Sequence, residues 1–252
     1  MQTACSAPSV LFQFIGKTVA ISGACGGIGS KVAAMFYEAG ANLVLIDQDA
    51  FLLAQALLNF PERARTVVCD QSQPAHIDRA VQEVGRVDIF INNAGMVMRS
   101  PLFDLTSRQL QTIVEVNLTG AMLMAVGMAR LMVSQKSGVV VNVCSQHAFC
   151  AVKERAAYSV TKAGLAQFTR TAAHEWAEHG IRVVAVAPGP VDTPMTAGLT
   201  SSGGRQALLD HIPLGRFSSA SEMAGLILFL SSDLASTVLG QTLIADGGYV
   251  LA

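Results

Sequence analysis

Seven short apolar segments recur along this chain, and longer segments with helical spacing separate them. Each short segment is rich in Val, Ile and Leu and lacks the polar–apolar alternation of a strand with one face in water. The segments cover residues 17–22, 42–46, 65–69, 87–91, 138–143, 181–186 and 242–245. Strands of this kind are buried on both faces, and strands that alternate with helices form parallel sheets. The sequence therefore predicts an α/β fold, a doubly wound parallel sheet of about seven strands with helices on both faces.

The size and charge of the chain narrow the possibilities further. It has 252 residues, of which 51% are hydrophobic and 14% are charged, and its formal net charge is -1. These values exclude a disordered chain, and a single α/β domain of this length is common. A near-neutral chain has no electrostatic footprint for nucleic acid or for an anionic membrane surface. We predict one domain over 15–252, preceded by an N-terminal extension over 1–14.

The N-terminus, the most apolar stretch and the cysteines bear on where such a chain resides. Residues 1–10 lack the basic start and apolar run of a signal peptide. The stretch 118–133 is interrupted by two glycines and an arginine and is short for a membrane span, so we interpret it as a helix buried between subunits. The five cysteines form no CxxC pair and no zinc-binding spacing. We predict a soluble, cytoplasmic protein with reduced cysteines and no metal site.

One long segment, 188–217, lacks a regular pattern and contains a Gly/Ser-rich run at 200–204. It is either a disordered surface loop or a lid over a binding site. Because it follows the carboxyl end of a strand, where ligands bind in such sheets, the lid is the preferred interpretation. Ser219 and Glu222 have the spacing of a capping box and predict the start of the helix that follows.

A glycine-rich turn joins the first predicted strand to the first predicted helix. Its sequence is Ser-Gly-Ala-Cys-Gly-Gly-Ile-Gly over residues 22–29, with glycines at positions 23, 27 and 29 in the spacing GxxxGxG. Such glycines let the backbone turn sharply and approach a pyrophosphate at a helix N-terminus. A tight loop without a ligand is the alternative. The strand before the turn and the helix after it favour a dinucleotide site.

An acidic residue, Asp47, ends the second predicted strand, about twenty residues beyond the glycines. A carboxylate there accepts hydrogen bonds from an adenosine ribose and repels a 2′-phosphate. No Lys or Arg lies in the glycine turn or beside Asp47 to receive that phosphate. The sequence therefore predicts NAD rather than NADP as the cofactor.

Tyr158 and Lys162 are spaced i, i+4 at the start of a predicted helix, which places their side chains on one face. A free phenol is a poor base at neutral pH, but a neighbouring lysine charge and an oxidised nicotinamide would favour its phenolate form. By itself this pair occurs by chance on many helices.

Further motifs follow the predicted strands in order: Asn-Asn-Ala-Gly at 92–95, Asn117 in the long helix, Ser145 after the fifth strand, Pro-Gly-Pro-Val-Asp-Thr at 188–193 and Asp-Gly-Gly at 246–248. Together with the glycine turn and the Tyr-Lys pair, they resemble the short-chain dehydrogenase/reductase family over nearly the whole chain from residue 15. One position departs from the family: the sixth strand has Val184 or Ala185 where an Asn usually stands. The resemblance implies a Rossmann-like fold and an oxidoreductase that interconverts an alcohol and a ketone.

The resemblance also implies a tetrad of Asn117, Ser145, Tyr158 and Lys162. Tyr158 would exchange a proton with the substrate oxygen, and Ser145 would hydrogen-bond that oxygen. Lys162 would bind the nicotinamide ribose and favour the phenolate, while Asn117 would hold a water in a proton relay. Other positions are expected to contact the cofactor, with Asp70 at the adenine and Thr193 at the nicotinamide amide. Together with Tyr158 and Lys162, the expected cofactor contacts are Gly23, Cys25, Gly27, Ile28, Gly29, Asp47, Asp70, Asn93, Ala94, Gly95, Pro188, Gly189, Val191 and Thr193.

The substrate is the least constrained part of the prediction. His147 and Arg155 flank the segment that should line the substrate pocket, with Met195 as a further expected contact. Relatives resembling 3-hydroxybutyrate dehydrogenase hold a carboxylate with a His and a basic residue at such places, and an arginine fork suits that geometry. A packed imidazole for His147 and a loop charge for Arg155 are nevertheless the preferred interpretation, because Val97 replaces a polar contact of that branch.

We expect a small polar alcohol or ketone, a hydroxy acid or a sugar or polyol, as the substrate. Two alternative functions stay open, a 3-oxoacyl reductase and a non-catalytic NAD-binding sensor or scaffold. The resemblance also implies a homotetramer formed through helices at about 106–134 and 158–179.

Overall fold

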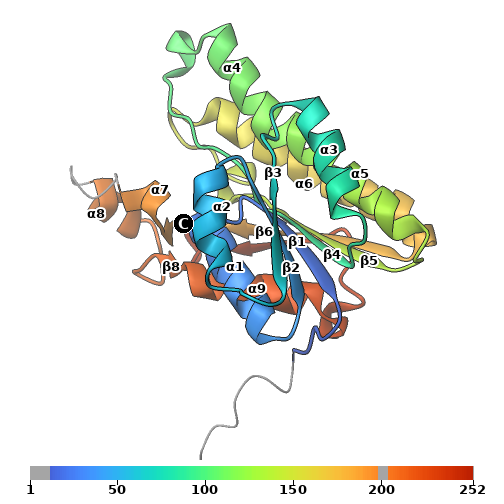
Figure 1. Ribbon diagram of the computed structural model, residues 1–252. Coiled ribbons are helices and arrows are strands. Elements are labelled where there is room, and N and C mark those ends of the chain that lie inside the picture. The colour runs from blue at the N-terminus through green and yellow to red at the C-terminus, as the bar shows by residue number, and fades with distance from the viewer. Residues whose placement is uncertain (1–11, 198–203, 252) are drawn as a thin grey trace, which may run out of the picture.

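The computed structural model describes residues 12–197 and 204–251, and it contains the predicted parallel sheet (Figure 1). Seven strands pair in the order β3-β2-β1-β4-β5-β6-β9, and every pairing is parallel. Their bounds are β1 Thr18–Ser22, β2 Asn42–Asp47, β3 Ala64–Val68, β4 Ile89–Asn92, β5 Gly138–Val143, β6 Ile181–Pro188 and β9 Thr242–Ala245. The predicted fold class is therefore confirmed, and the predicted strand ends differ by at most two residues.

The central strands are buried on both faces, as their unbroken apolar sequence predicts. In β1, Val19, Ala20 and Ile21 each have no exposed surface. β1 lies between β2 and β4, so the chain moves outward in one direction from β1 to β3 and in the other from β4 to β9. The strand order reverses between β1 and β4, and ligands of such sheets bind outside the carboxyl ends of the strands at this point.

Two layers of helices cover the sheet (Figure 1). The core against one face contains side chains of α1, α2 and α9, and the core against the other contains side chains of α3, α5 and α6. The helices are α1 Gly27–Glu38, α2 Ala50–Leu57, α3 Pro74–Val84, α4 Ser107–Val114, α5 Ala121–Val133, α6 Ala156–Trp176, α7 Pro194–Ala197, α8 Gly204–Leu209 and α9 Ala220–Ser231. Ser219 and Glu222 form the predicted capping box at the start of α9.

One continuous helical stretch, Ser107–Val133, is long and apolar enough to cross a membrane by length and composition alone. Within it, Met124, Met128 and Met132 have no exposed surface and belong to the core against the sheet. This apolar sequence is therefore explained by packing inside the domain. The stretch is not uniform, because a π-helical turn, Glu115–Gly120, separates α4 from α5.

The described chain begins inside the predicted N-terminal extension. Phe14 is 4% exposed and packs edge-on against Phe36 of α1, with the ring centroids 4.8 Å apart. Its backbone N–H donates to the carbonyl oxygen of Ala39 at 2.8 Å. The packed part of the chain therefore starts before residue 15, and residues 1–11 of the predicted extension lie outside the described part.

Candidate active site

The glycine turn, residues 23–29, lies at the reversal of strand order and has no room for side chains at two of its glycines. Gly23 has φ +62°, a left-handed conformation that favours glycine, and an added Cβ there would lie 2.8 Å from Cα of Ala94. A Cβ on Gly29 would overlap the carbonyl oxygen of Gly23. The turn therefore packs directly against the start of α1, which leaves its backbone open to a close ligand such as a pyrophosphate.

Asp47 ends β2, and its side chain is directed to the glycine turn. Its Oδ2 atom accepts a hydrogen bond from the backbone N–H of Cys25 at 3.0 Å. Burial, and then the negative charge of Asp47, raise the pKa of the Cys25 thiol to about 12. The turn thus presents a neutral thiol beside a fixed carboxylate.

Side chains tie the turn to the loop after β4. The amide nitrogen of Asn93 donates to the carbonyl oxygens of Ser22 and Gly23, each at 3.0 Å. In return, the hydroxyl of Ser22 accepts from the backbone N–H groups of Asn93 and Ala94, again at 3.0 Å. Asn93 and Ala94 were predicted on the cofactor side, whereas Ser22 had no signal in the sequence beyond its place at a strand end.

Gln71 is a second residue that sequence analysis missed. Its amide nitrogen donates to the carbonyl oxygens of Ala94, at 3.2 Å, and Val116, at 2.8 Å. It therefore links the end of β3 to the loop after β4 and to the π-helical turn. The neighbouring Asp70, predicted at the adenine, accepts from the backbone N–H of Ser72 at 2.9 Å.

Asn117 and Lys162 meet at Gly95, although they are 45 positions apart in sequence. An added Cβ on Gly95 would lie 3.2 Å from Oδ1 of Asn117 and 3.4 Å from Nζ of Lys162. Asn117 is fully buried in the π-helical turn, where it accepts from the backbone N–H of Met96 and donates to its carbonyl oxygen, both at 2.8 Å. Lys162 is 5% exposed and donates to the carbonyl oxygen of Val143 at 2.8 Å.

Tyr158 and Ser145 lie beside this pair. Nζ of Lys162 is 5.9 Å from the centre of the Tyr158 ring, which confirms that the two side chains share one face of α6. The ring of His147 packs edge-on against Tyr158 with centroids 5.6 Å apart, and its backbone N–H donates to the hydroxyl of Ser145 at 3.2 Å. The four predicted tetrad positions thus gather at the carboxyl ends of β4 and β5 and the first turns of α6.

Thr161 supports this group and was not predicted. Its hydroxyl donates to the carbonyl oxygen of Tyr158 at 2.7 Å and accepts from the Asn117 amide at 3.5 Å. It therefore connects the π-helical turn to α6. Its side chain is fully buried, and its place between Tyr158 and Lys162 in the chain was the only signal that the sequence offered.

The predicted substrate side carries positive charge and a neutral imidazole. Burial, and then the positive charges of Arg155 and Arg99, lower the pKa of His147 to about 4. Arg155 stands just before α6 and donates from Nη1 to the carbonyl oxygen of Met98 at 3.3 Å. Gln146, another residue that was not predicted, is 2% exposed, and its Oε1 faces Gly189 of the predicted cofactor set.

The segment 188–217 contains more regular structure than its sequence predicted. Its two-residue strand β7, Val191–Asp192, pairs in parallel with β8, Ser218–Ser219, which follows the segment directly, and α7 and α8 lie between the two strands. Residues 198–203 lie outside the described part, as does the side chain of Met195, so the predicted substrate contact at Met195 is not described.

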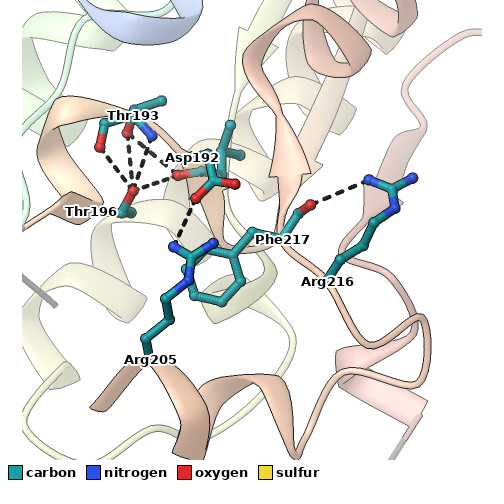
Figure 2. A network of polar contacts seen from close by, with 7 residues as sticks. Asp192, Thr193, Thr196, Arg205, Arg216 and Phe217 are labelled. Carbon is teal, nitrogen blue, oxygen red and sulfur yellow. Dashed lines mark hydrogen bonds and ion pairs between the residues drawn. The ribbon is translucent and has the colours of Figure 1, made fainter. Parts of the chain in front are cut away.

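Figure 2 shows how the two ends of this segment are joined. Arg205 of α8 donates to Asp192 of β7 at 2.8 Å, and its guanidinium lies 4.2 Å above the centre of the Phe217 ring. Next to this pair, the hydroxyl of Thr196 donates to the carbonyl oxygen of Val191 at 2.6 Å and accepts from the backbone N–H of Thr193 at 3.1 Å. Thr193, which was predicted to contact the nicotinamide amide, is therefore held by Thr196 of α7, the helix that follows it. We call the contact of Arg205 with Asp192 and Phe217 the clasp.

The described residues contain no cluster of three or more His, Cys, Asp or Glu side chains that could hold a metal ion. Across the same ranges, the cysteines at 25, 69, 144 and 150 are free.

Comparison with known sequences finds dehydrogenases and reductases that match this chain over nearly its whole length. A family model described as enoyl-(acyl carrier protein) reductase matches residues 23–250. The cis-4-hydroxycyclohexanecarboxylate dehydrogenase of Sinomonas cyclohexanicum is 39% identical over 94% of this chain and 97% of its own. The 3-oxoacyl-[acyl-carrier-protein] reductase of Thermotoga maritima is 35% identical over 94% and 98%. The NAD-dependent glycerol dehydrogenase of Listeria innocua is 33% identical over 95% and 96%.

Comparison with solved structures also finds a dehydrogenase. The gluconate 5-dehydrogenase of Burkholderia cenocepacia, solved with NADP and tartrate, superposes with a TM-score of 0.91 at 31% identity. The match covers 96% of this chain and 98% of that one. The chain is an oxidoreductase and belongs to the short-chain dehydrogenase/reductase family.

Proposed function

We propose that this protein is an NAD-dependent oxidoreductase that interconverts a secondary alcohol and a ketone, with Tyr158 as its acid and base. One observation carries the proposal: Asn117 and Lys162 meet at Gly95, beside Tyr158 and at the same sheet edge as the glycine turn. When bound, the nicotinamide supplies or accepts the hydride. The chain supplies the binding geometry and the proton.

Each tetrad residue has a task that its position supports. The Tyr158 phenol gives a proton to the substrate oxygen during reduction and takes it back during oxidation. Ser145 donates a hydrogen bond to the same oxygen and orients it. The buried Lys162 ammonium lies 5.9 Å from the centre of the Tyr158 ring and is placed to bind the nicotinamide ribose. Asn117 is placed to connect Lys162 to a proton relay.

The preference for NAD rests on Asp47. Its carboxylate is held on the glycine turn by the Cys25 N–H, where it would accept from the adenosine ribose and repel a 2′-phosphate. The Listeria relative is NAD-dependent by name, whereas the Burkholderia structure holds NADP. We expect Asp47→Ser to reduce the ratio of kcat/KM for NAD over NADP by at least about tenfold, or about 1.4 kcal/mol. A wild-type preference for NADPH would overturn the assignment.

The substrate is, on this proposal, a small hydroxy acid or polyol. The relatives with dehydrogenase names act on a hydroxycyclohexanecarboxylate and on glycerol. The second candidate is a 3-oxoacyl reductase, which the Thermotoga relative and the description of the matching family model favour. A non-catalytic NAD sensor has less support, because all four tetrad residues are present.

A substrate panel tests this proposal most directly. The purified protein is mixed with NAD and hydroxy acids, sugars, polyols, steroid alcohols and 3-hydroxyacyl thioesters, and NADH formation is followed by absorbance. Turnover of small hydroxy acids or polyols is the expected result. Turnover confined to acyl thioesters or steroids would remove the substrate class, and no turnover of any alcohol with either cofactor would remove the enzymatic proposal.

We further propose a cytoplasmic homotetramer that uses the α4, α5 and α6 surface. Large apolar side chains are exposed there, with Leu110 41%, Leu123 40% and Val160 63% exposed. Monomers seldom leave an extended apolar patch in water. Light scattering coupled to size-exclusion chromatography should give four times the chain mass of 26.4 kDa.

A further inference from the structure

Gln71 holds two segments of the chain with a single side-chain nitrogen. Its Nε2 atom donates to the carbonyl oxygen of Ala94 in the loop after β4, at 3.2 Å, and to that of Val116 in the π-helical turn, at 2.8 Å. Gln71 is 7% exposed, and both hydrogens of its amide are used on backbone atoms. The side chain is therefore a buried cross-link between the loop and the turn.

The two carbonyl groups that Gln71 binds lie next to residues of the site. Ala94 directly precedes Gly95, and Val116 directly precedes Asn117. An added Cβ on Gly95 would lie 3.2 Å from Oδ1 of Asn117, so these two residues are close neighbours. Gln71 therefore holds the backbone one residue before each of them.

Asn117 fixes the same loop on the other side of Gly95. Its side chain accepts from the backbone N–H of Met96 and donates to the carbonyl oxygen of Met96, both at 2.8 Å. Functional side chains depend on surrounding hydrogen bonds to stay within about 0.5 Å of their working positions. With the contact to Met96 alone, the π-helical turn could pivot on the loop. Gln71 supplies a second anchor, so the loop and the turn are joined on both sides of Gly95.

The backbone of Gln71 also packs directly against the π-helical turn. An added Cβ on Gly120 would overlap the carbonyl oxygen of Gln71 and would lie 2.8 Å from its Cγ. Gly120 has φ -64°, so the close approach, and not the backbone conformation, requires a glycine here. Such π-helical turns are rare within α-helices and are frequent at functional sites. Residue 71 thus contacts the turn that carries Asn117 through both its side chain and its backbone.

We propose that Gln71 is a positioning residue for proton transfer, because it holds the π-helical turn so that Asn117 stays beside Lys162. This inference rests on the proposed function and deepens it, because it assigns a role in proton transfer to a residue outside the tetrad. The glycine turn has its own attachment to the loop, the bonds between Ser22 and Asn93, in which Gln71 takes no part. Loss of the Gln71 amide should therefore affect proton transfer more than nucleotide binding.

Gln135 offers a matched control, because it has the same chemistry at the opposite edge of the sheet. Its Nε2 atom also donates to two backbone carbonyl oxygens, those of Val87 at 2.8 Å and Leu131 at 3.4 Å. In both glutamines, Oε1 is buried without a partner among the described residues. Val87 precedes β4, so this contact lies at the amino ends of the strands, away from the tetrad.

The test replaces each glutamine by methionine, which has a similar length and no hydrogen-bond donor. With NAD and the best alcohol of the panel, kcat, the substrate KM and the solvent deuterium isotope effect on kcat are measured, and NADH affinity is measured by fluorescence titration. We expect Gln71→Met to lower kcat at least about tenfold and to leave KM and NADH affinity within about threefold. The isotope effect should rise, because proton transfer becomes slower. Gln135→Met should leave all four values unchanged.

Gly120→Ala disturbs the same contact from the other side while the Gln71 amide stays intact. The added Cβ must move the π-helical turn away from the Gln71 carbonyl. This variant should therefore show the same fall in kcat and the same rise in the isotope effect. Equal losses of kcat in Gln71→Met and Gln135→Met, a loss in Gln71→Met without a rise in the isotope effect, or wild-type kcat in Gly120→Ala would overturn the proposal.

Amide hydrogen exchange separates failure of this inference from failure of the proposed function, because it requires no turnover. Exchange in peptides that cover 93–97 and 114–121 is followed by mass spectrometry on the protein without cofactor. Faster exchange of both peptides in Gln71→Met, but not in Gln135→Met, supports the positioning of the turn by Gln71 even if no panel alcohol reacts. Exchange in Gln71→Met at the wild-type rate contradicts it, whatever the activity.

Discussion

The cofactor side and the substrate side of this site are built in different ways. On the cofactor side, backbone groups and short side chains fix the structure, as in the paired bonds of Ser22 and Asn93 across the reversal of strand order. On the substrate side, long side chains dominate: the guanidinium of Arg155 donates to the carbonyl oxygen of Met98, and the clasp joins the ends of 188–217. The comparison indicates that nucleotide binding depends on backbone shape, whereas substrate choice depends on side-chain charge.

The largest effect on cofactor binding is expected from a single added methyl group on the cofactor side. A Cβ at Gly29 would overlap the carbonyl oxygen of Gly23, so Gly29→Ala must move the glycine turn away from α1. We expect NADH affinity to fall at least about 100-fold, or about 2.7 kcal/mol, with an equal loss of kcat/KM. Fluorescence titration with NADH measures the affinity.

Gly225→Ala is the matched control for that variant. Gly225 lies in α9, has no heavy atom within 4 Å of an added Cβ, and does not have positive φ. Alanine there should leave NADH affinity unchanged and raise stability by about 0.5–1 kcal/mol. If both variants bind NADH like wild type, the tight packing of the glycine turn is not needed for binding.

Features of the site that depend on local sequence could be predicted, whereas those that depend on distant contacts could not. The strands, the glycine turn and Asp47 are visible in sequence because their signals are local: unbroken apolar runs, glycine spacing and a strand end. Ser22 and Gln71 were missed because their partners lie more than 20 positions away and bond through backbone atoms. The hydrogen bonds between 98–100 and 154–155 depend on two loops meeting, which no local pattern encodes. Phe14 was assigned to an extension because one aromatic residue before a strand does not reveal that it packs on α1.

A second, smaller effect is expected on the substrate side when the pH falls. The pKa of His147 is lowered to about 4 in the folded protein, from an ordinary value of 6.5. The unfolded chain therefore binds this proton first, so the stabilising contribution is complete above pH 6.5 and is lost progressively from 6.5 toward 4. His147→Gln should lose about 2 kcal/mol less stability than wild type between pH 7.5 and 4.5. Urea unfolding at both pH values measures this, and parallel losses would contradict it.

The smallest effect is expected at the clasp (Figure 2). The Arg205–Asp192 pair is partly exposed, with 36% and 54% of the two side chains accessible. Removing this ion pair should therefore have only a modest effect. Arg205→Gln should raise the substrate KM by about threefold and leave NADH affinity unchanged, because the contact joins the ends of a segment on the substrate side. A change in NADH affinity as large as that in KM would show that this segment belongs functionally to the cofactor side.

Tyr158→Phe tests the central claim most directly, because it removes only the phenolic oxygen that should carry the proton. NADH affinity and turnover are measured on the same preparation, the first by fluorescence titration and the second with the best alcohol of the panel. The account predicts NADH affinity within about twofold of wild type and a fall in kcat of about 10²–10⁴. Turnover within twofold of wild type, with NADH still bound, would contradict it.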